Sequence, residues 1–510
     1  MTTNSIASAE GTTSASSTSL GNDSSAPVVE LTTPFDHITF LGYTHIMLAF
    51  ASQSPDTTTL RRALKRVLER APFVGGTVQA IVLPPPSAAP NMLGQPSGFH
   101  RIGAPYEEVD TIFAVHDLRD ATAENGGLDF AQWLASGAPV RPLTRYCAAP
   151  PALVPPPAPV ARIRLTIVNG GCFISTSWHH AALDGHGLAR VVQAWAAECH
   201  TTGGADTVDF SRMGGPAALE QFEALPLDAH DLEHDLRILH RAYIQAPPQS
   251  APFPPQVPEA TTAFYFPSAA LAELKTAASS DLPPGAWVST NDALTALIWT
   301  RVSRAIGRDA GVNVAMNVRT RFDPPVKETY VGNAVYFVRA LPLVEDGVKG
   351  EDESKPELEL DLSKAAHAVH TAVRSLTPQH LDSVAKIVSA RTPILEAHAH
   401  PEGPVAVSSW HAQSFHSFDW GAETFPPAAT TDLAASPGTS PISPTTSSVK
   451  PGFCMRVLAP KFFRPRLCII MPARPGGMDV VIGLKAEHMR RLLEDDVWKR
   501  YARRESGWPQ

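Results

Sequence analysis

The order of elements in residues 162–199 constrains the fold more than any other feature of this chain. Apolar and polar residues alternate over 162–167, which predicts a half-buried strand, and 169–171 (Asn-Gly-Gly) is typical of a hairpin turn. Residues 172–178 read as the returning strand, and 188–199 carries apolar residues at helical spacing. The sequence therefore predicts a β-hairpin that leads through a short loop into a helix.

The loop between this strand and this helix carries the chemistry. Residues 177–185 read SWHHAALDG. An imidazole titrates near neutral pH, so His180 can take a proton from a hydroxyl and return it within one reaction. Asp184 follows four residues later at a bend, where it can fix the shape of the loop. Reactive side chains are often placed on such loops by a rigid scaffold, so the segment predicts a general-base site.

Segments of biased composition divide the chain, whose 510 residues favour two or three domains. Residues 1–34 are expected to be a disordered tail, and the proline-rich residues 246–260 a crossover linker. The linker separates an N-terminal domain, 35–245, from a C-terminal domain, 261–510. A Ser/Thr/Pro/Ala tract at 424–451 is expected to be a disordered insertion in the second domain.

Composition excludes several classes of protein. The net charge of -8 and the lack of a basic block argue against nucleic-acid binding. No apolar run is long enough to cross a bilayer, and the N-terminus lacks the pattern of a signal peptide. Five scattered cysteines without C-x-x-C spacing indicate a reduced compartment and no zinc site. The default expectation is a cytoplasmic enzyme without stable membrane insertion and without a bound metal.

The second half also alternates between strand and helix patterns. Strands are expected near 262–266, 312–318 and 479–484, with a helix whose N-cap is expected at Asn291. No internal repeat, glycine-rich phosphate loop or dinucleotide fingerprint is present. The sequence therefore offers no pattern that indicates a permanently bound nucleotide cofactor.

Several ordered segments together resemble the BAHD-type acyl-CoA-dependent acyltransferases, especially fungal members of the trichothecene-acetyltransferase type that acylate secondary metabolites. The resemblance covers most of the chain, and its segments occur in the expected order and at plausible spacing. They are Asp36-His37 with the helix and Pro-x-x-Gly-Gly that follow, the HxxxD of 180–184, the helix start at 291–299, the N-x-R-x-R…P-P…Y-V-G-N segment of 317–333, and Ser408-Ser409-Trp410.

The resemblance implies an α/β fold of the chloramphenicol-acetyltransferase and condensation-domain type. Two similar domains, each a mixed sheet with flanking helices, would enclose an active-site channel. Acyl-CoA would enter from one face and a small-molecule hydroxyl acceptor from the other. The implied function is transfer of an acyl group, most simply acetyl from acetyl-CoA, to a terpenoid, alkaloid or glycolipid hydroxyl. Acetyl-CoA would be a co-substrate, and the chain is expected to be a monomer because it supplies both walls of the site.

The site residues follow from the same resemblance. His180 would be the general base, acting in a complex with both substrates and without an acyl-enzyme. Asp184 would turn away from the imidazole and pair with Arg319 of the second domain, which locks the loop. A structural histidine and a solvated aspartate in a turn are the simpler alternatives for these two positions.

Two further groups of residues are expected to contact the donor. Trp410 and Ser408 are candidates for stabilising the oxyanion of the tetrahedral intermediate, although Trp410 can equally be a core residue. Ser289, Thr290 and Asn291 are candidates for binding the pantetheine or phosphates of CoA at a helix N-terminus. Simple helix capping explains these three residues equally well.

One segment departs from the family pattern. The D-F-G-W-G of the family corresponds here to 417–421, Ser-Phe-Asp-Trp-Gly. The change puts the local loop geometry in doubt more than the chemistry.

Three rival functions remain at this stage. A stand-alone condensation-type domain would share the histidine loop but take its acyl group from a carrier protein. A non-catalytic ligand-binding relative would keep the fold without turnover. A metal-dependent hydrolase lacks a ligand set, because the adjacent His179 and His180 are expected to point to opposite faces. The identity of the acceptor, the acyl length and the choice of oxygen or nitrogen as acceptor atom are not determined by the sequence.

Overall fold

The structure of the chain is a computed structural model. It describes residues 33–39, 42–81, 99–136, 141–149, 156–200, 243–245, 260–343, 358–389, 394–396, 403–426, 449–457, 466–474 and 476–504. Most of the tail expected at 1–34 lies outside these residues, but its end was wrongly placed, because Thr33 is buried and Pro34 begins a helix. Most of the linker expected at 246–260 also lies outside the described residues, except Ala260, which begins a strand.

The first sheet has five strands in the order β14-β1-β7-β6-β4. Its centre is the predicted hairpin, in which β6 and β7 pair antiparallel with Ala161 opposite Trp178. Gly170 makes the turn with φ +83°, a left-handed conformation that glycine adopts without strain. Only β4 and β6 run parallel, so the sheet is mixed. The strand bounds are β1 Tyr43–Phe50, β4 Phe113–Asp117, β6 Ala161–Val168, β7 Gly171–His179 and β14 Phe453–Val457.

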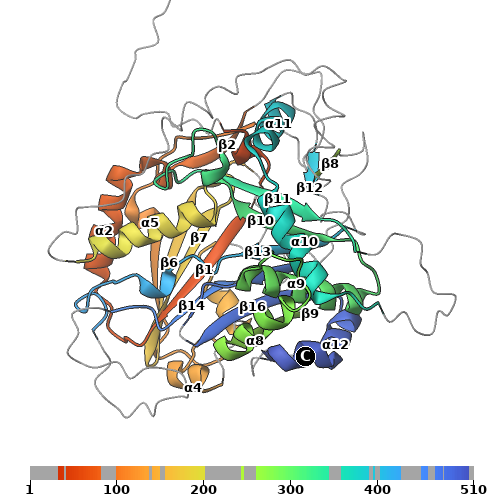
Figure 1. The fold of residues 1–510 in the computed structure, drawn as a ribbon. Helices are drawn as coiled ribbons and strands as arrows, with labels where there is room; N and C mark the ends of the chain where they lie inside the picture. Colours follow the sequence, from red (N-terminus) through yellow and green to blue (C-terminus); the bar gives the residue numbers. More distant parts are fainter. Residues whose placement is uncertain are drawn as a thin grey trace, which may run out of the picture.

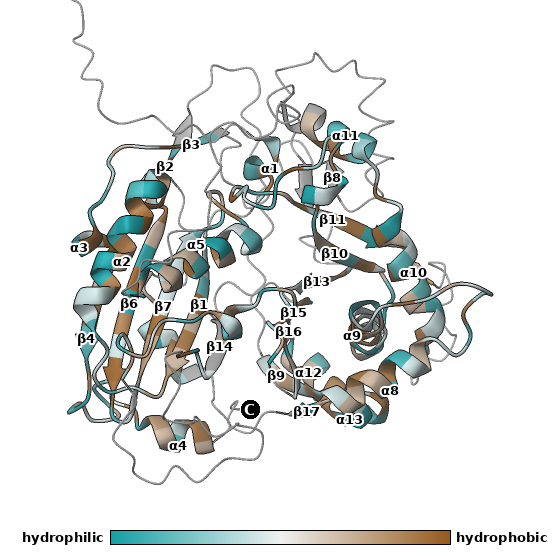
Figure 2. Ribbon diagram, turned by 60° about the vertical axis from the view of Figure 1, so that its left-hand side comes forward, coloured by the Kyte–Doolittle hydropathy of each residue, from teal (hydrophilic) through white to brown (hydrophobic). Residues whose placement is uncertain are grey.

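The second sheet has seven strands in the order β11-β10-β13-β15-β16-β9-β17. It is also mixed, because β13 pairs parallel with both β10 and β15 while the other pairs are antiparallel. Figure 2 shows the two sheets in separate halves of the molecule. The bounds are β9 Ala260–Pro267, β10 Val312–Asn317, β11 Val335–Ala340, β13 Val405–Ser409, β15 Leu467–Ile470, β16 Gly477–Leu484 and β17 Arg503–Arg504.

Helices flank both sheets (Figure 1). In the first half α2 packs beside α5, and in the second α9 packs against both α8 and α10. Within the described residues, no helix is long and apolar enough to cross a membrane. The helices are α1 Pro34–His37, α2 Thr57–Arg70, α3 Val109–Ile112, α4 Phe130–Ala135, α5 Gly185–Glu198, α8 Ser268–Ala278, α9 Thr290–Ile306, α10 Leu362–Arg374, α11 Pro378–Ser389, α12 Ala486–Glu494 and α13 Asp496–Tyr501.

Short elements complete the chain. Strands β2 and β3 pair antiparallel, β5 pairs with β2, and β8 pairs with β12. The remaining bounds are β2 Thr77–Ile81, β3 Phe99–Gly103, β5 Ala158–Pro159, β8 Tyr243–Gln245 and β12 Ile394–Glu396, with 3-10 turns at Pro72–Gly75, Arg141–Tyr146, Arg319–Arg321 and Phe415–Ser417.

The two halves exchange elements, which corrects the simple division at residues 245 and 261. Strand β14 follows far into the second half but pairs with β1 of the first sheet, with Met47 opposite Met455. In the opposite direction, Phe35 of α1 is fully buried in the second core and packs edge-on against Phe322 at 5.4 Å between ring centroids. Because each half contributes to the other core, the position of the loop at their junction is held from both sides.

The ends of the tract expected to be disordered at 424–451 belong to the fold. Thr424 and Phe425 are buried, and Phe425 stacks on Phe50 with ring centroids 4.0 Å apart. Burying the apolar Phe425 ring in this core is more favourable than leaving it in water. The tract has no hydrophobic periodicity, so the sequence did not predict this burial. Residues 427–448 of the tract lie outside the described residues.

The segment that departs from the family pattern forms a well-defined turn. One oxygen of the Asp419 carboxylate accepts hydrogen bonds from the backbone N–H of Gly421 at 3.0 Å and of Val449 at 2.9 Å. The neighbouring Trp420 is fully buried against Trp195. The aspartate that replaces a glycine of the pattern therefore ties Gly421 to Val449, two described residues that are 28 positions apart.

Candidate active site

The histidine loop begins where β7 ends and closes where α5 begins. His180 follows directly after β7, and its backbone N–H donates to the Gly42 carbonyl at 2.8 Å. Residues 179 and 181–184 are buried, whereas the His180 side chain is partly exposed. The loop therefore exposes the His180 imidazole and buries its neighbouring side chains.

Asp184 ends the loop as the N-cap of α5. One of its oxygens accepts from the Gly187 N–H at 2.8 Å, and the other accepts from the Ala334 N–H at 2.9 Å. The Arg319 guanidinium donates to both oxygens, at 2.9 and 3.1 Å. The carboxylate and the guanidinium are both buried, at 1% and 0% exposed. The pair joins the first half of the chain to the second across the site.

The electrostatics of this pair favour the charged carboxylate. Burial by itself raises the pKa of Asp184, but the Arg319 charge and the hydrogen bonds from Arg319, Gly187 and Ala334 outweigh it and hold the pKa below its ordinary value. None of the described hydrogen bonds of Asp184 goes to His180. The geometry is that of a residue that locks a loop.

All three guanidinium nitrogens of Arg319 donate hydrogen bonds within the second half. Its Nε donates to the Tyr330 carbonyl at 3.0 Å, and its Nη2 donates to the Gly332 carbonyl at 2.7 Å. Its Nη1 also reaches the Asn317 side-chain oxygen at 3.1 Å. A buried guanidinium is tolerated when its donors are satisfied in this way. The segment from Asn317 to Gly332 therefore forms the socket for the Asp184–Arg319 pair.

The close approach of the two halves depends on Gly187. A Cβ at this position would lie 2.0 Å from the Val331 carbonyl oxygen, far inside van der Waals contact. Any larger residue would push α5 away from the 317–333 segment. A glycine here lets the loop and its socket meet.

The sequence predicts a structural turn at residues 330–333 near the domain interface and no contact for Asp36, and the structure joins Asp36 and Asn333 to the loop. Asp36 accepts from the backbone N–H of Asn333 at 3.1 Å and from its side-chain amide at 2.8 Å. The same amide donates to the His180 carbonyl at 3.0 Å. Both residues occur in segments that match the family pattern, but their partnership spans 297 positions and no local signal reveals it.

The second half contributes Trp410 and Ser408. A Cβ on Gly185 would lie 2.9 Å from the Trp410 ring, so the indole packs directly beneath the end of the loop. The indole is 5% exposed, and its N–H donates to the Ser408 hydroxyl oxygen at 3.2 Å. The structure thus brings both residues to the loop, and their role toward an oxyanion stays a prediction.

The third predicted group lies at the start of α9. Ser289 is the N-cap, because its hydroxyl accepts from the Asp292 N–H and the Asp292 carboxylate accepts from the Ser289 N–H. The expectation that Asn291 is the N-cap was wrong, because the Ser-x-x-Asp spacing of a capping box decides the start. Asn291 instead accepts from the Ser409 hydroxyl at 2.8 Å. Ser289, Thr290 and Asn291 therefore lie next to the strand that carries Ser408.

The neighbouring histidines have separate structural contacts. His179 is fully buried, its Nδ1 accepts from the Ala181 N–H, and its ring meets Tyr43 edge-on at 5.5 Å. His186 lies with its Nε2 2.9 Å from the Glu328 carbonyl oxygen of the second half. Within the described residues, no group of three or more His, Cys, Asp or Glu side chains could hold a metal ion.

Two α/β halves that lock a histidine loop at their junction define the chain as an acyltransferase of the two-domain type. The model of the Transferase family matches residues 152–432, more than half of the chain. The chain belongs to this family, the BAHD-type acyltransferases, which confirms the resemblance seen in the sequence.

Curated relatives match most of the chain. Trichothecene 3-O-acetyltransferase TRI101 of Fusarium sporotrichioides is 24% identical, over 90% of this chain and 93% of its own length. The O-acetyltransferase cpsE of Aspergillus campestris is 26% identical, over 92% and 95%. The crystal structure of F. sporotrichioides TRI101 complexed with coenzyme A and T-2 matches with a TM-score of 0.65 and 22% identity, covering 94% of this chain and 99% of that one. The structural match supports the two-domain fold.

We predict that Asp36→Ala lowers the turnover number about tenfold and changes the KM for the acyl donor little. Without the Asp36 carboxylate, the two Asn333 donors lose their acceptor inside the protein, which costs about 1–3 kcal/mol of stability. The amide that orients the His180 carbonyl is then free to turn away. Steady-state kinetics and thermal unfolding measure the two effects. Thr39→Val is the control, because the Thr39 hydroxyl reaches the same carbonyl only at 3.4 Å; equal losses in both variants would contradict the prediction.

We also predict that the protein loses stability between pH 7 and pH 5. Burial lowers the pKa of His37 to about 3, with a contribution from nearby His100, and burial lowers the pKa of His100 to about 4. Below pH 6.5 the unfolded chain takes up protons on both residues and the folded protein does not. Each buried histidine such as His100 therefore lowers the free energy of unfolding by at most about 1.4 kcal/mol for each pH unit below 6.5.

Thermal unfolding at both pH values measures this dependence. The variant His100→Gln should show a smaller loss between pH 7 and pH 5 than the unmodified chain, whatever its stability at pH 7. An unchanged difference between the two pH values would show that His100 is protonated in the folded protein.

Proposed function

We propose that the chain transfers an acyl group, most simply acetyl from acetyl-CoA, to a hydroxyl of a small fungal secondary metabolite. The observation that carries the proposal is the partly exposed His180 imidazole on a loop locked by the buried Asp184–Arg319 pair. The relatives support the donor and the reaction, because they are named O-acetyltransferases and the TRI101 crystal structure contains coenzyme A.

The transfer is direct. His180 takes the proton of the acceptor hydroxyl while its oxygen attacks the thioester carbonyl carbon. The tetrahedral intermediate then collapses, the C–S bond breaks, and His180 returns the proton to the CoA thiolate. The cysteines do not supply a nucleophile, because all five are buried and burial raises their thiol pKa values, that of Cys147 to about 12.

Ser408 and Trp410 act together on the negative charge of the intermediate. The Trp410 N–H donates to the Ser408 oxygen, which leaves the Ser408 hydroxyl proton to be donated to the oxyanion. A hydrogen-bond donor placed where this negative charge develops lowers the activation free energy by about 3 kcal/mol. The start of α9, with Ser289, Thr290 and Asn291, binds the pantetheine arm of the donor beside this point.

The deciding experiment follows free thiol release from acetyl-CoA in the presence of pooled fungal alcohols, including a trichothecene, an alkaloid and a glycolipid. Acceptor-dependent release that is lost in His180→Ala supports the proposal, and the responding pool identifies the acceptor class. No release with short- or long-chain acyl-CoA, together with no CoA binding by calorimetry, would favour a carrier-protein donor or a non-catalytic relative.

A monomer and a cytoplasmic location complete the proposal. Both walls of the site come from one chain, because Asp184 and Arg319 meet within it. Sedimentation velocity that shows a stable dimer would contradict the first statement, and imaging of a fluorescent fusion expressed in a fungal cell tests the second.

A further inference from the structure

Basic residues gather at one end of the second sheet. Val312, which begins β10, lies opposite Ala340, which ends β11, and beside Val405, which begins β13. The next two strands reach the same end, because the Arg466 carbonyl just before β15 accepts from β13 and its N–H donates to the Gly483 carbonyl of β16, both at 2.9 Å. The basic residues at or near these strand ends, with one from α12, are Arg308, Arg339, Arg466, Lys485 and Arg491. We call these five residues the Arg308 patch.

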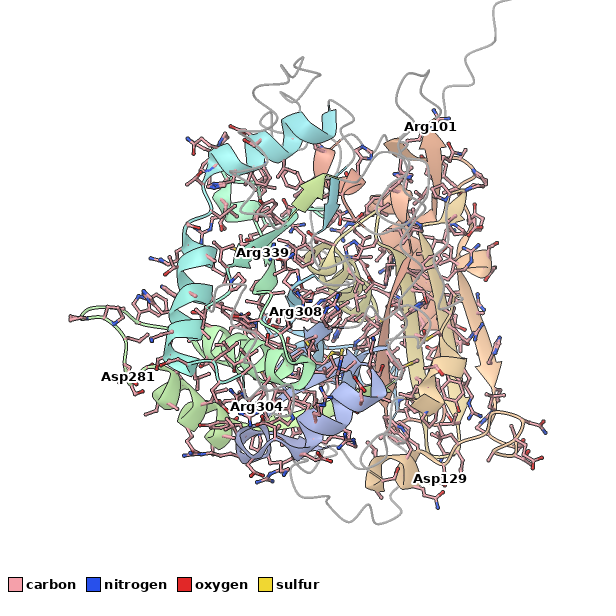
Figure 3. The ribbon with its side chains drawn as sticks, turned by 90° about the vertical axis from the view of Figure 1, so that its right-hand side faces the viewer. Arg101, Asp129, Asp281, Arg304, Arg308 and Arg339 are labelled. Atoms are coloured by element: carbon pink, nitrogen blue, oxygen red, sulfur yellow. The ribbon has the colours of Figure 1, made fainter. Side chains whose placement is uncertain are left out.

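Contacts place the patch around the C-terminal end of α9. The Arg339 guanidinium donates to the Ala310 carbonyl at 2.8 Å, and the Arg491 guanidinium donates to a carbonyl in the last turn of α9 at 3.2 Å. Figure 3 shows Arg339 above Arg308 in the second half of the molecule. Burial and, next, the neighbouring Arg308 charge lower the pKa of Arg466 to about 10, so its guanidinium is still charged at neutral pH. The patch is therefore one positive surface.

Three members of the patch, Arg308, Lys485 and Arg491, form no ion pair with any carboxylate of the described residues. Glu487, which lies between the last two in the sequence, contacts the His488 imidazole at 3.1 Å. The whole chain has a net charge of -8, but salt limits the reach of an exposed charge to about 10 Å at 0.1 M, so distant acidic residues do not cancel the patch. The patch therefore favours a negatively charged partner.

An exposed leucine lies at the same end of the sheet. Leu341 follows Arg339 by two residues and is 51% exposed. The chain beside it is fixed to the base of the patch, because the Leu343 N–H donates to the buried Asp309 carboxylate at 2.8 Å. At a membrane surface an apolar side chain enters the boundary between headgroups and acyl chains while basic side chains stay with the headgroups. An exposed leucine among cations therefore favours a lipid surface.

The patch lies far from the histidine loop. Strand β13 begins at the patch with Val405 and ends with Ser409, and the next residue, Trp410, packs against Gly185 of the loop. The patch and the candidate active site thus lie at opposite ends of the second sheet. A partner on the patch would leave the site open.

We propose that the Arg308 patch binds the surface of a membrane that contains anionic lipids. The inference goes beyond the proposed acyl transfer and does not depend on it. The basic groups bind the phosphates and carboxylates of the lipid headgroups, and Leu341 enters the interface. The contact is peripheral and reversible, so it needs no membrane-spanning helix, and the described residues contain none.

Cosedimentation of the full chain with vesicles tests the proposal. The vesicles consist of phosphatidylcholine alone or with added phosphatidylserine, at low ionic strength. The unmodified chain should bind the anionic vesicles more tightly than the neutral ones and should be released by salt. Arg308→Ala/Arg491→Ala should weaken this binding roughly 25-fold, because one basic side chain near an anionic surface is worth roughly fivefold. Leu341→Ser should weaken it about tenfold without a change in charge.

A matched double variant controls for net charge. Arg62→Ala/Lys65→Ala removes two exposed basic residues of α2 in the first half, and it should bind the vesicles as the unmodified chain does. Thermal unfolding of each variant verifies that it is folded. Polyglutamate serves as a probe for an acidic polypeptide partner, and Leu341→Ser should leave its binding unchanged.

Several outcomes would overturn the proposal. They are equal binding to neutral and anionic vesicles, equal losses in the two double variants, and binding of polyglutamate without binding of vesicles, which would indicate an acidic protein partner. Residues 344–357 lie outside the described residues and carry six acidic side chains, so a variant that lacks them is measured as well. Vesicle binding by that variant alone would overturn the proposal for the full chain.

The proposed transfer is tested separately. The patch variants should release thiol from acetyl-CoA at the rate of the unmodified chain, because the patch is remote from His180. Loss of vesicle binding with normal transfer supports the patch. A chain that binds anionic vesicles through the patch and shows no transfer would count against the proposed function alone.

Discussion

Replacing His180 by alanine should reduce acetyl transfer about 10²–10⁴-fold while the protein stays folded and binds CoA normally. The magnitude follows from the loss of a positioned general base, and residual activity would come from the remaining binding and oxyanion contacts. Because the His180 side chain is partly exposed, its removal leaves no large cavity, and the backbone contacts of the loop to Gly42 and Asn333 remain.

A matched histidine provides the control. His186→Gln removes an imidazole six residues away that faces Glu328, and it should retain transfer within a few-fold. The measurement is thiol release at saturating acetyl-CoA for both variants, with CoA affinity by calorimetry. Equal activity of His180→Ala and the unmodified chain would rule out the general-base assignment.

Replacing Asp184 by alanine should destabilise the protein by about 3–5 kcal/mol and abolish transfer as a consequence. The change leaves the Arg319 charge buried without its partner, and this penalty exceeds the value of the pair itself. The Gly187 and Ala334 N–H groups lose their acceptor as well. Chemical denaturation measures the free energy of unfolding, and thiol release measures the activity.

The double variant Asp184→Leu/Arg319→Met distinguishes locking from chemistry. It removes both buried charges, so it should be more stable than Asp184→Ala. If Asp184→Ala were as stable as the unmodified chain and yet inactive, the aspartate would have a direct part in the reaction.

The same carboxylate should contribute to acid denaturation. Its pKa is lowered in the folded state, so its contribution to stability is fully present above the unfolded value near 3.9 and is lost as the pH falls through the lower folded value. This contribution is therefore complete at pH 7, where the stability of the Asp184 variants is compared.

Much of the local structure follows from the sequence because its causes are local. The alternation in 162–167 and the Asn-Gly-Gly turn specify the hairpin of β6 and β7, and their bounds agree with the expectation to within one or two residues. The start of α9 was misplaced at Asn291, although the capping-box spacing of Ser289 and Asp292 was available as a signal. The failure lay in choosing between two acceptable caps.

The domain boundaries were harder to predict from the sequence, because a hydrophobic pattern indicates that a strand exists but not which sheet it joins. Strand β14 lies in the second half of the sequence and completes the first sheet. Phe425 was assigned to a disordered tract, and only its neighbours Phe50 and Trp420 in the folded protein explain its burial. Both cases depend on partners that are distant in the sequence.

The sequence by itself determined the histidine loop, its placement between a strand and a helix, and the family to which the chain belongs, because these depend on residue types at short, fixed spacings. The tertiary structure decided how the loop is held. Asp36, Asn333 and His180 meet only when the N-terminal segment packs into the second half. Such contacts arise from the packing of whole elements, and no local pattern of residues encodes them.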